Sequence, residues 1–250
     1  MLKFIIPTSL SLICGGLWFL YKNKNVQKLI YVEGNIGSGK SSLLKMIENK
    51  INNSKLIYEP VGTWMSITGS HGKDDNILSN FYNNMTRWAY SMQNIVYLTR
   101  INDLINSRKL ACDKKYIFSE RSIFTDRHIF AEIAHKSNNM NELEWKWYLE
   151  WYSFLYKYFE NWIEPNGYIY LNCDVGVSMN RIKKRDRDGE DKIDVNYLRE
   201  LNDCHDLWMG QVQRSGKPVL VLNCNNDFLE NEEEMNKHLM AINNFIKNIK

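Results

Sequence analysis

The chain has 250 residues, of which 44% are hydrophobic, 24% charged and 13% aromatic. This composition is typical of a globular protein with one sizeable core, and it excludes a disordered chain, a collagen-like chain and a disulfide scaffold. The 32 basic and 29 acidic side chains leave a net charge of only +3, so we expect no nucleic acid among the partners and any cationic site to be local.

The first predicted element is an apolar segment at residues 4–21. Its roughly 18 residues lie at the lower limit for a membrane-spanning helix, and a proline and a glycine pair weaken it. Three lysines follow it, an arrangement that would keep the rest of the chain on the cytoplasmic side. We therefore divide the chain into a leader at residues 1–28, expected to be a membrane anchor, and a folded domain at residues 29–250. Mitochondrial targeting and a leader without structure remain the alternatives.

Short β-rich runs alternate with longer helical stretches in the folded domain. Five strands are predicted, at Leu29–Glu33, Leu56–Tyr58, Tyr116–Ser119, Tyr168–Asn172 and Val219–Leu222. This alternation predicts one doubly wound α/β domain, with a mainly parallel sheet and helices on both faces. Ligands of such sheets bind beyond the carboxyl ends of the strands, so we look for the chemistry there.

A glycine-rich turn follows the first strand and precedes a helix predicted at Ser42–Asn49. It fits the phosphate-binding pattern G-x-x-x-x-G-K-[ST] with Gly34, Asn35, Ile36, Gly37, Ser38, Gly39, Lys40 and Ser41. In this pattern the backbone N–H groups converge on phosphate oxygens at the positive end of the helix. We expect Lys40 to reach the transferred phosphoryl group, Ser41 to ligate Mg²⁺, and Ser42 to complete the donor site. No Asn-Lys-x-Asp segment for reading guanine occurs, which favours ATP as the donor and leaves UTP open.

Charged side chains close the second and third strands. Glu59 ends the second strand, where its carboxylate could take a proton from an attacking hydroxyl group. Glu120 and Arg121 end the third strand and would supply a carboxylate for Mg²⁺ and a guanidinium for the charge on the phosphoryl group. Each could form a surface ion pair by itself, but their convergence on one phosphate-binding loop favours an active site.

A basic segment follows the fourth strand after one helical stretch. Arg181 and Arg185 are one helical turn apart and share a face, and Arg187 follows them. A nuclear-import signal or a solvated helix face would also contain such a cluster. Close to a phosphate-binding loop, we predict a mobile arginine lid over the donor.

Two polar residues lie seven positions apart on a helix predicted at residues 85–107. Gln93 and Arg100 differ by only about 20° in direction, so they share one stripe of this helix. Together they suit the edge of one base, with the guanidinium of Arg100 held by Asp126. Tyr82 has the same direction, but a continuous helix would place it about 16 Å from Gln93. We therefore predict a break in the helix at residues 83–86.

In order and spacing, these motifs resemble the deoxynucleoside kinases of the deoxycytidine, deoxyguanosine and mitochondrial thymidine kinase type. The resemblance runs from about Leu29 to the end of the chain and excludes the leader. Its motifs are residues 34–42, residues 59–61 with Trp64, Gln93 and Arg100, residues 120–127, the arginine lid and residues 225–228. It implies a P-loop kinase fold with a five-stranded sheet, and ATP-dependent phosphorylation of the deoxynucleoside 5′-hydroxyl in nucleotide salvage.

The resemblance also implies the roles of residues in the catalytic and donor sites. It makes Glu59 the general base, Glu120 the acid associated with the metal and Arg121 the arginine that contacts phosphate. The lid arginines would be Arg181, Arg185 and Arg187, and the loop against the donor base would contain Asp227 and Phe228.

The acceptor site follows from the same resemblance. The sugar 3′-hydroxyl would lie between Tyr82 and Glu190, and the base would lie on Gln93 between the aromatic walls of Trp64 and Phe130. Arg100 and Asp126 match members that accept deoxycytidine and deoxypurine nucleosides, which predicts that thymidine is a poor substrate. The family forms dimers through long helices, so we expect a homodimer surface on residues 142–162 and 85–107.

Two other functions remain open from the sequence. A nucleoside monophosphate kinase would share the phosphate loop and the lid but would need further cationic groups for the acceptor phosphate. A non-catalytic, kinase-like subunit anchored through residues 4–21 would have no chemical reason to keep Lys40, Ser41, Glu59, Glu120 and Arg121 together. The five histidines show no spacing typical of a metal site, and we expect them to be surface or helix residues.

Overall fold

The computed structural model describes residues 27–70, 72, 75–187 and 190–249. The predicted apolar segment at residues 4–21 lies outside the described residues. Within the described ranges, no helix combines the length and the apolar character that crossing a membrane requires.

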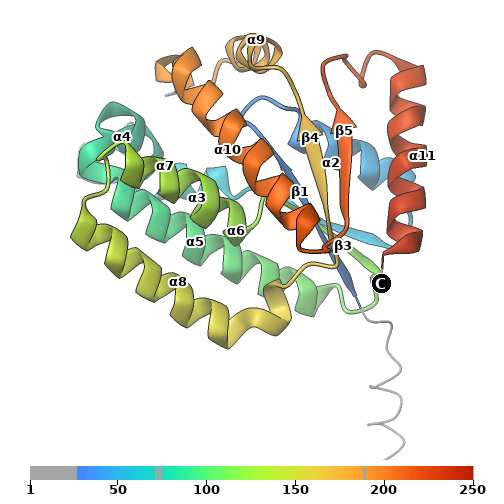
Figure 1. The fold of residues 1–250 in the computed structure, drawn as a ribbon, viewed down its shortest axis with the longest axis horizontal. Coiled ribbons are helices and arrows are strands. Elements are labelled where there is room, and N and C mark those ends of the chain that lie inside the picture. The colour runs from blue at the N-terminus through green and yellow to red at the C-terminus, as the bar shows by residue number, and fades with distance from the viewer. Residues whose placement is uncertain (1–26, 71, 73–74, 188–189, 250) are drawn as a thin grey trace, which may run out of the picture.

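A five-stranded sheet forms the centre of the fold (Figure 1). Its strands are β1 (Lys28–Gly34), β2 (Ser54–Ile57), β3 (Tyr116–Glu120), β4 (Gly167–Asn172) and β5 (Val219–Asn223). They lie in the order β2-β3-β1-β4-β5, and every neighbouring pair is parallel. All five predicted strands are confirmed. The second is displaced toward the N-terminus, so Tyr58 follows β2 instead of ending it.

Helices cover both faces of the sheet, which confirms the doubly wound α/β fold (Figure 1). The helical elements are α2 (Lys40–Lys50), α3 (Val61–Ser66), α4 (Ile77–Asn83), α5 (Met85–Leu110), α6 (Ile123–Thr125), the π-helical turn η1 (Asp126–Phe130), α7 (Ala131–Lys136), α8 (Glu142–Ile163), α9 (Val175–Arg185), the 3₁₀ turn η2 (Glu190–Lys192), α10 (Val195–Arg214) and α11 (Glu232–Asn248). One core lies between the sheet and α2 with α11. A second lies between the other face and α5, α8 and α10.

Alternate side chains of β1 enter these two cores. Ile30 and Val32 pack against α2 and α11, whereas Leu29 and Tyr31 pack on the opposite face. All four are almost completely buried, which explains why β1 is a continuous apolar run rather than an alternating one.

The predicted break in the long helix is confirmed at Asn84, which lies between α4 and α5. The backbone N–H of Asn84 still donates to the carbonyl of Asn80, while its side chain accepts the backbone N–H of Arg87 at 3.0 Å. One asparagine therefore ends α4 and caps α5. The break allows Tyr82 and Gln93 to line the same cavity.

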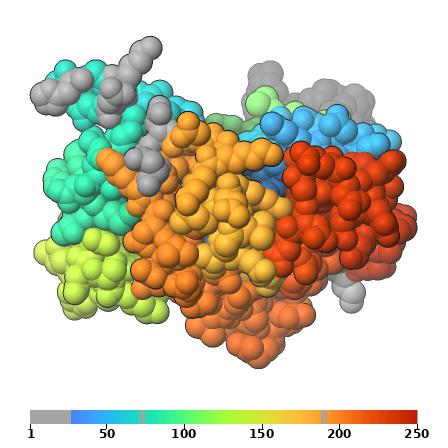
Figure 2. Space-filling model, turned by 90° about the horizontal axis from the view of Figure 1, so that it is seen from above, coloured from blue at the N-terminus to red at the C-terminus, as the bar shows by residue number. Residues whose placement is uncertain are grey.

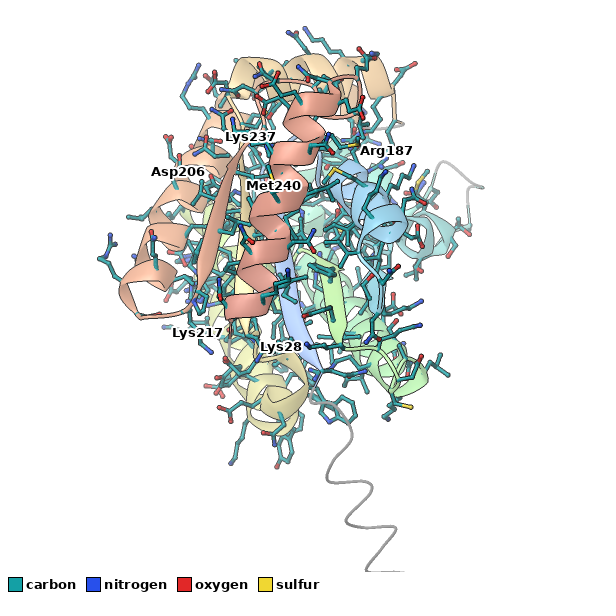
Figure 3. The ribbon with its side chains drawn as sticks, turned by 90° about the vertical axis from the view of Figure 1, so that its right-hand side faces the viewer. Lys28, Arg187, Asp206, Lys217, Lys237 and Met240 are labelled. Carbon is teal, nitrogen blue, oxygen red and sulfur yellow. The ribbon has the colours of Figure 1, made fainter. Side chains whose placement is uncertain are left out.

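The carboxyl ends of the parallel strands meet at one edge of the sheet. In Figure 3, Lys28 at the start of β1 lies in the lower half of the molecule, and Arg187, which follows α9, lies in the upper half. Lys28 donates to the carbonyl of Ile249 at 2.5 Å, which ties the start of β1 to the end of α11. Figure 2 looks onto the other end, where α9 lies between the α4 region and α11. The predicted site lies at this end.

Candidate active site

The turn between β1 and α2 has the conformation that its glycines allow. Gly37 and Gly39 have φ values of +79° and +99°, a region that side chains with a Cβ rarely adopt. A Cβ at Gly37 would also overlap the carbonyl oxygen of Ser178. Asn35 fixes the turn from outside, since its amide donates to the carbonyl of Leu198 at 2.8 Å. The predicted phosphate-binding loop is therefore preformed at the N-terminus of α2.

Lys40 lies buried inside this turn. Its ammonium group donates to the backbone carbonyls of Gly34 at 3.1 Å and Asn35 at 2.7 Å. Burial, together with the charge of Arg121, lowers the pKa of Lys40 to about 7, against the opposing effect of Glu120 and Glu59. A phosphate anion in the turn would favour the charged ammonium.

Ser41 and Glu120 form an oxygen-rich pair beside the loop. The hydroxyl of Ser41 donates to the carboxylate of Glu120, at 2.8 Å to Oε1 and 3.0 Å to Oε2. The described part of the chain has no cluster of three or more histidine, cysteine or acidic residues that could hold a metal ion. A hydroxyl and one carboxylate fit Mg²⁺, an ion that proteins commonly hold with few side chains together with substrate phosphates and water.

Glu59 belongs to a network of buried charges. Its Oε1 accepts a hydrogen bond from Arg100 Nη2 at 2.9 Å and lies 3.4 Å from Arg121 Nε. Arg100 Nε donates to Asp126 Oδ2 at 2.8 Å, and Nη1 donates to the backbone carbonyl of Glu120 at 2.9 Å. The expected contact between Arg100 and Asp126 is thus present, and Arg100 also holds Glu59.

The carboxylate of Glu59 is ionised in this network. Burial by itself would raise its pKa, but the positive charges of Arg121, Arg100 and Lys40 outweigh burial and lower the pKa to about 2. The side chain keeps a fifth of its surface exposed, on the wall of a cavity. Glu59 therefore presents a deprotonated carboxylate to a group that enters this cavity.

Arg121 connects the base and the phosphate loop. Its Nη1 donates to the carbonyl of Gly34 at 2.9 Å, and its guanidinium lies 4.8 Å from the ring centre of Phe130. Its backbone has φ +60°, which costs a residue with a Cβ roughly 1–2 kcal/mol. A hydrogen bond of 2.9 Å from its backbone N–H to Val32 helps to hold this strained conformation.

The cavity beside Glu59 brings together the residues predicted to bind the acceptor. Its lining includes Trp64, Tyr82, Gln93, Arg100, Asp126, Phe130 and Glu190. Gln93 is buried, and its Oε1 has no hydrogen-bond partner in the structure. A buried, unsatisfied amide oxygen on a cavity wall indicates a ligand that donates a hydrogen bond.

A second cavity contains most of the residues predicted to bind the donor; Gly34, Asn35 and Ser38 are not in its lining, and Ile36 lines the first cavity instead. It is lined by Gly37, Gly39, Lys40, Ser41, Ser42, Lys45, Glu120, Arg181, Arg185, Arg187, Asp227, Phe228 and Leu229. Both cavities include Gly37, Lys40, Ser41, Glu120 and the last two lid arginines. A group transferred from one cavity to the other would cross at these residues.

The lid arginines have partners within the protein. Arg185 forms a two-pronged ion pair with Glu190, at distances of 2.6–3.0 Å, and Arg187 contacts the same carboxylate at 3.2 Å. Arg181 donates to the backbone carbonyls of Cys224 at 2.8 Å and Asn226 at 3.2 Å. Arg181 therefore braces the loop that carries Asp227 and Phe228, in addition to lining the donor cavity.

Sequence reasoning missed part of the acceptor cavity. The cavity is also lined by apolar and tyrosine side chains that include Leu78, Phe81, Met92, Val96 and Tyr197. Their helical spacing indicates a buried face, and most buried helical faces pack against a core. The neighbouring polar residue, Gln93, was the available signal that this face borders a ligand.

Comparisons with known proteins agree with this geometry. A family model described as "Deoxynucleoside kinase" matches residues 30–247. The chain is 32% identical over 237 residues to a Gallus gallus protein named deoxycytidine kinase 2. This match covers 87% of this chain and 89% of that protein. It is 31% identical over 244 residues to a Xenopus laevis protein named mitochondrial deoxyguanosine kinase, with 89% and 92% covered. Deoxycytidine kinase from Mus musculus is 31% identical over 230 residues, with 83% and 88% covered.

Proposed function

The chain belongs to the deoxynucleoside kinase family and is an enzyme that phosphorylates deoxynucleosides with ATP in nucleotide salvage, and we propose that Glu59 is its general base. In this proposal Glu59 takes the proton of the 5′-hydroxyl, and the 5′-oxygen attacks the γ-phosphorus in line as the bond to ADP breaks. The support is that Glu59 is ionised and lines a cavity shared with the phosphate loop.

Positive charge along the path would stabilise the transferred phosphoryl group. We assign this role to Lys40, Arg185 and Arg187, which line both cavities, and to Arg121, which lines the cavity beside Glu59. The two lid arginines must exchange part of their contact with Glu190 for phosphate oxygens, since they are paired with that carboxylate in the structure. Glu190 then becomes available to the 3′-hydroxyl, the role proposed for it together with Tyr82.

Mg²⁺ is part of this proposal. Ser41 and Glu120 would hold it together with oxygens of the triphosphate, and the bound ion would neutralise charge on the phosphates.

We propose that deoxycytidine and the deoxypurine nucleosides are preferred to thymidine. Gln93 Oε1 needs a hydrogen-bond donor, which the amino group of cytosine or adenine and the N3–H of thymine can each supply, so the preference rests on the neighbouring wall. The buried pair of Arg100 and Asp126 fills the neighbouring wall with charge that a thymine methyl group cannot satisfy.

A comparison of acceptor substrates tests this preference. With ATP as donor, initial rates are measured for four deoxynucleosides and for their 5′-monophosphates. We expect kcat/KM for deoxycytidine or a deoxypurine nucleoside to exceed that for thymidine by at least roughly tenfold, and the monophosphates to be inactive as acceptors. Thymidine as the best acceptor would contradict the proposed base site, and a monophosphate as the best acceptor would contradict the proposed reaction.

We propose further that two copies associate through α8 and the neighbouring part of α5. Large apolar side chains recur on one face of α8 at intervals of three and four residues and are exposed: Leu143, Trp147, Trp151, Phe154 and Tyr158. Leu98 and Leu110 of α5 are exposed as well, and α5 packs against α8. Such a surface is typical of an interface between protein chains.

A charge on this face is expected to separate the two copies. Trp151→Glu should shift the protein from dimer to monomer in light scattering coupled to gel filtration, because a carboxylate cannot be buried there without a partner. Leu207→Glu, at an exposed position of α10, is the matched control and should remain dimeric. A monomeric wild-type protein would contradict the proposed interface.

For the leader at residues 1–28 we propose a membrane anchor that leaves the catalytic domain in the cytoplasm. Support comes from the apolar segment at residues 4–21 and the lysines that follow it. The full chain and a chain that begins at Lys28 are compared by cell fractionation. We expect only the full chain to be recovered in a salt-washed membrane pellet. Recovery of the full chain in the mitochondrial matrix would contradict the anchor and favour targeting.

A further inference from the structure

His205 of α10 is completely buried and lies against the active site. Its ring stacks on Tyr170 of β4, with 6.2 Å between ring centres and 6° between planes. Tyr170 is fixed in turn, because its hydroxyl donates to Asp206 at 2.7 Å. Figure 3 labels Asp206, the neighbour of His205 in α10. The imidazole therefore has a fixed plane.

The hydrogen bonds of His205 determine where its proton lies. Nδ1 is 2.6 Å from the backbone carbonyl of Leu201, which can only accept, so Nδ1 carries the proton. Nε2 is 3.4 Å from Nη1 of Arg121, which can only donate. Nε2 therefore presents a lone pair to the guanidinium. Burial, followed by the charge of Arg121, lowers the pKa of His205 well below its ordinary value, in agreement with a neutral ring.

Three contacts orient the guanidinium of Arg121, and His205 supplies one of them. Arg121 Nη1 is shared between His205 and the carbonyl of Gly34, and Arg121 Nε faces Glu59. The guanidinium is thus oriented from three sides, by the phosphate loop, by the base and by α10. Asn35 of the phosphate loop is also bonded to α10, through the carbonyl of Leu198, so one helix supports both the loop and the arginine.

We propose that His205 is a positioning residue for the phosphoryl transfer: its neutral imidazole, anchored on Leu201, accepts a hydrogen bond from Arg121 and holds the guanidinium between Glu59 and the phosphate loop. This inference rests on the phosphate role proposed for Arg121. His205 itself touches neither substrate nor donor in this account, and its effect on catalysis passes through Arg121.

The tautomer can be tested in the wild-type protein. Imidazole ¹⁵N resonances, with His205 assigned by their loss in His205→Gln, should report a neutral ring protonated at Nδ1 from pH 6 to 8. A ring protonated at Nε2, or at both nitrogens, would overturn the inference, because Nε2 could then accept nothing from Arg121. This result does not depend on the role of Arg121 in the reaction.

A double-mutant cycle tests the effect on turnover. His205→Asn keeps an amide near Nδ1 and removes the acceptor that faces Arg121, whereas the longer side chain in His205→Gln can restore an acceptor near Nε2. We expect His205→Asn to lower kcat by roughly 10- to 100-fold with little change in the KM for nucleoside, and His205→Gln to recover most of the loss. In an Arg121→Ala background, His205→Asn should change kcat by less than about twofold.

Other outcomes of the double-mutant cycle would contradict the inference or the role of Arg121 on which it rests. Equal losses from His205→Asn in both backgrounds, with folding followed by thermal melting, would mean that His205 acts on the fold alone. Unchanged kcat in His205→Asn would overturn the inference outright. Full activity of Arg121→Ala would contradict the proposed role of Arg121, on which the inference rests, and would leave the tautomer result standing.

Discussion

Replacement of Glu59 by glutamine is expected to lower kcat by roughly 100- to 10,000-fold, the usual contribution of a general base. The amide has nearly the shape of the carboxylate but cannot take the proton of the 5′-hydroxyl. Because the pKa of Glu59 is about 2, the carboxylate is ionised well below neutrality, and the loss should be the same at pH 6 and at pH 8. Initial rates with ATP and deoxycytidine at the two pH values measure this.

Binding of ATP separates a lost base from a damaged site. Glu59→Gln should bind ATP as the wild type does in calorimetry, because the donor cavity does not include Glu59. Glu48→Gln, at an exposed position of α2, is the matched control and should keep full activity. A decrease in kcat of less than tenfold in Glu59→Gln would show that another group takes the proton.

Replacement of Asp126 by alanine is expected to lower the free energy of unfolding by about 3 kcal/mol, because it leaves the buried guanidinium of Arg100 without its main partner. Arg100 keeps Glu59 and the carbonyl of Glu120 as acceptors, so the effect should lie at the lower end for a broken buried ion pair. Urea unfolding measures the difference.

The matched control breaks a neighbouring ion pair, formed by Arg127 and Glu132. Arg127 pairs with Glu132 at 2.8 Å, but this pair is partly exposed to solvent. Glu132→Ala should therefore change the free energy of unfolding by less than about 1 kcal/mol. Equal effects of Asp126→Ala and Glu132→Ala would contradict a structural role for the buried pair.

Local sequence patterns were sufficient to predict the strands, the phosphate-binding turn and the helix break around this active site. The β-rich runs predicted all five strands, and the glycine spacing predicted the turn after β1. The helix break at Asn84 followed from the direction and distance of Tyr82 and Gln93 on a helix. These features depend on residues within about three helical turns of one another, where backbone geometry limits the choices.

Long side chains and distant contacts could not be predicted in this way. The sequence placed Arg181 over the phosphates, but its guanidinium also binds carbonyls of residues more than 40 positions later. His205 was expected to be an ordinary surface or helix histidine, but it is completely buried and contacts Arg121, 84 residues away in the sequence. Such pairs depend on how the helices pack on the sheet, which spacing along one element does not determine. The acceptor-lining Phe81 and Met92 have the periodicity of core residues for the same reason.

The most direct test of the proposed mechanism is a crystal structure with a bound deoxynucleoside. With deoxycytidine, we predict that the 5′-oxygen lies within about 3 Å of the Glu59 carboxylate and that the base donates a hydrogen bond to Gln93 Oε1. A nucleoside bound outside this cavity, or with its 5′-oxygen directed away from Glu59 and the phosphate loop, would contradict the account.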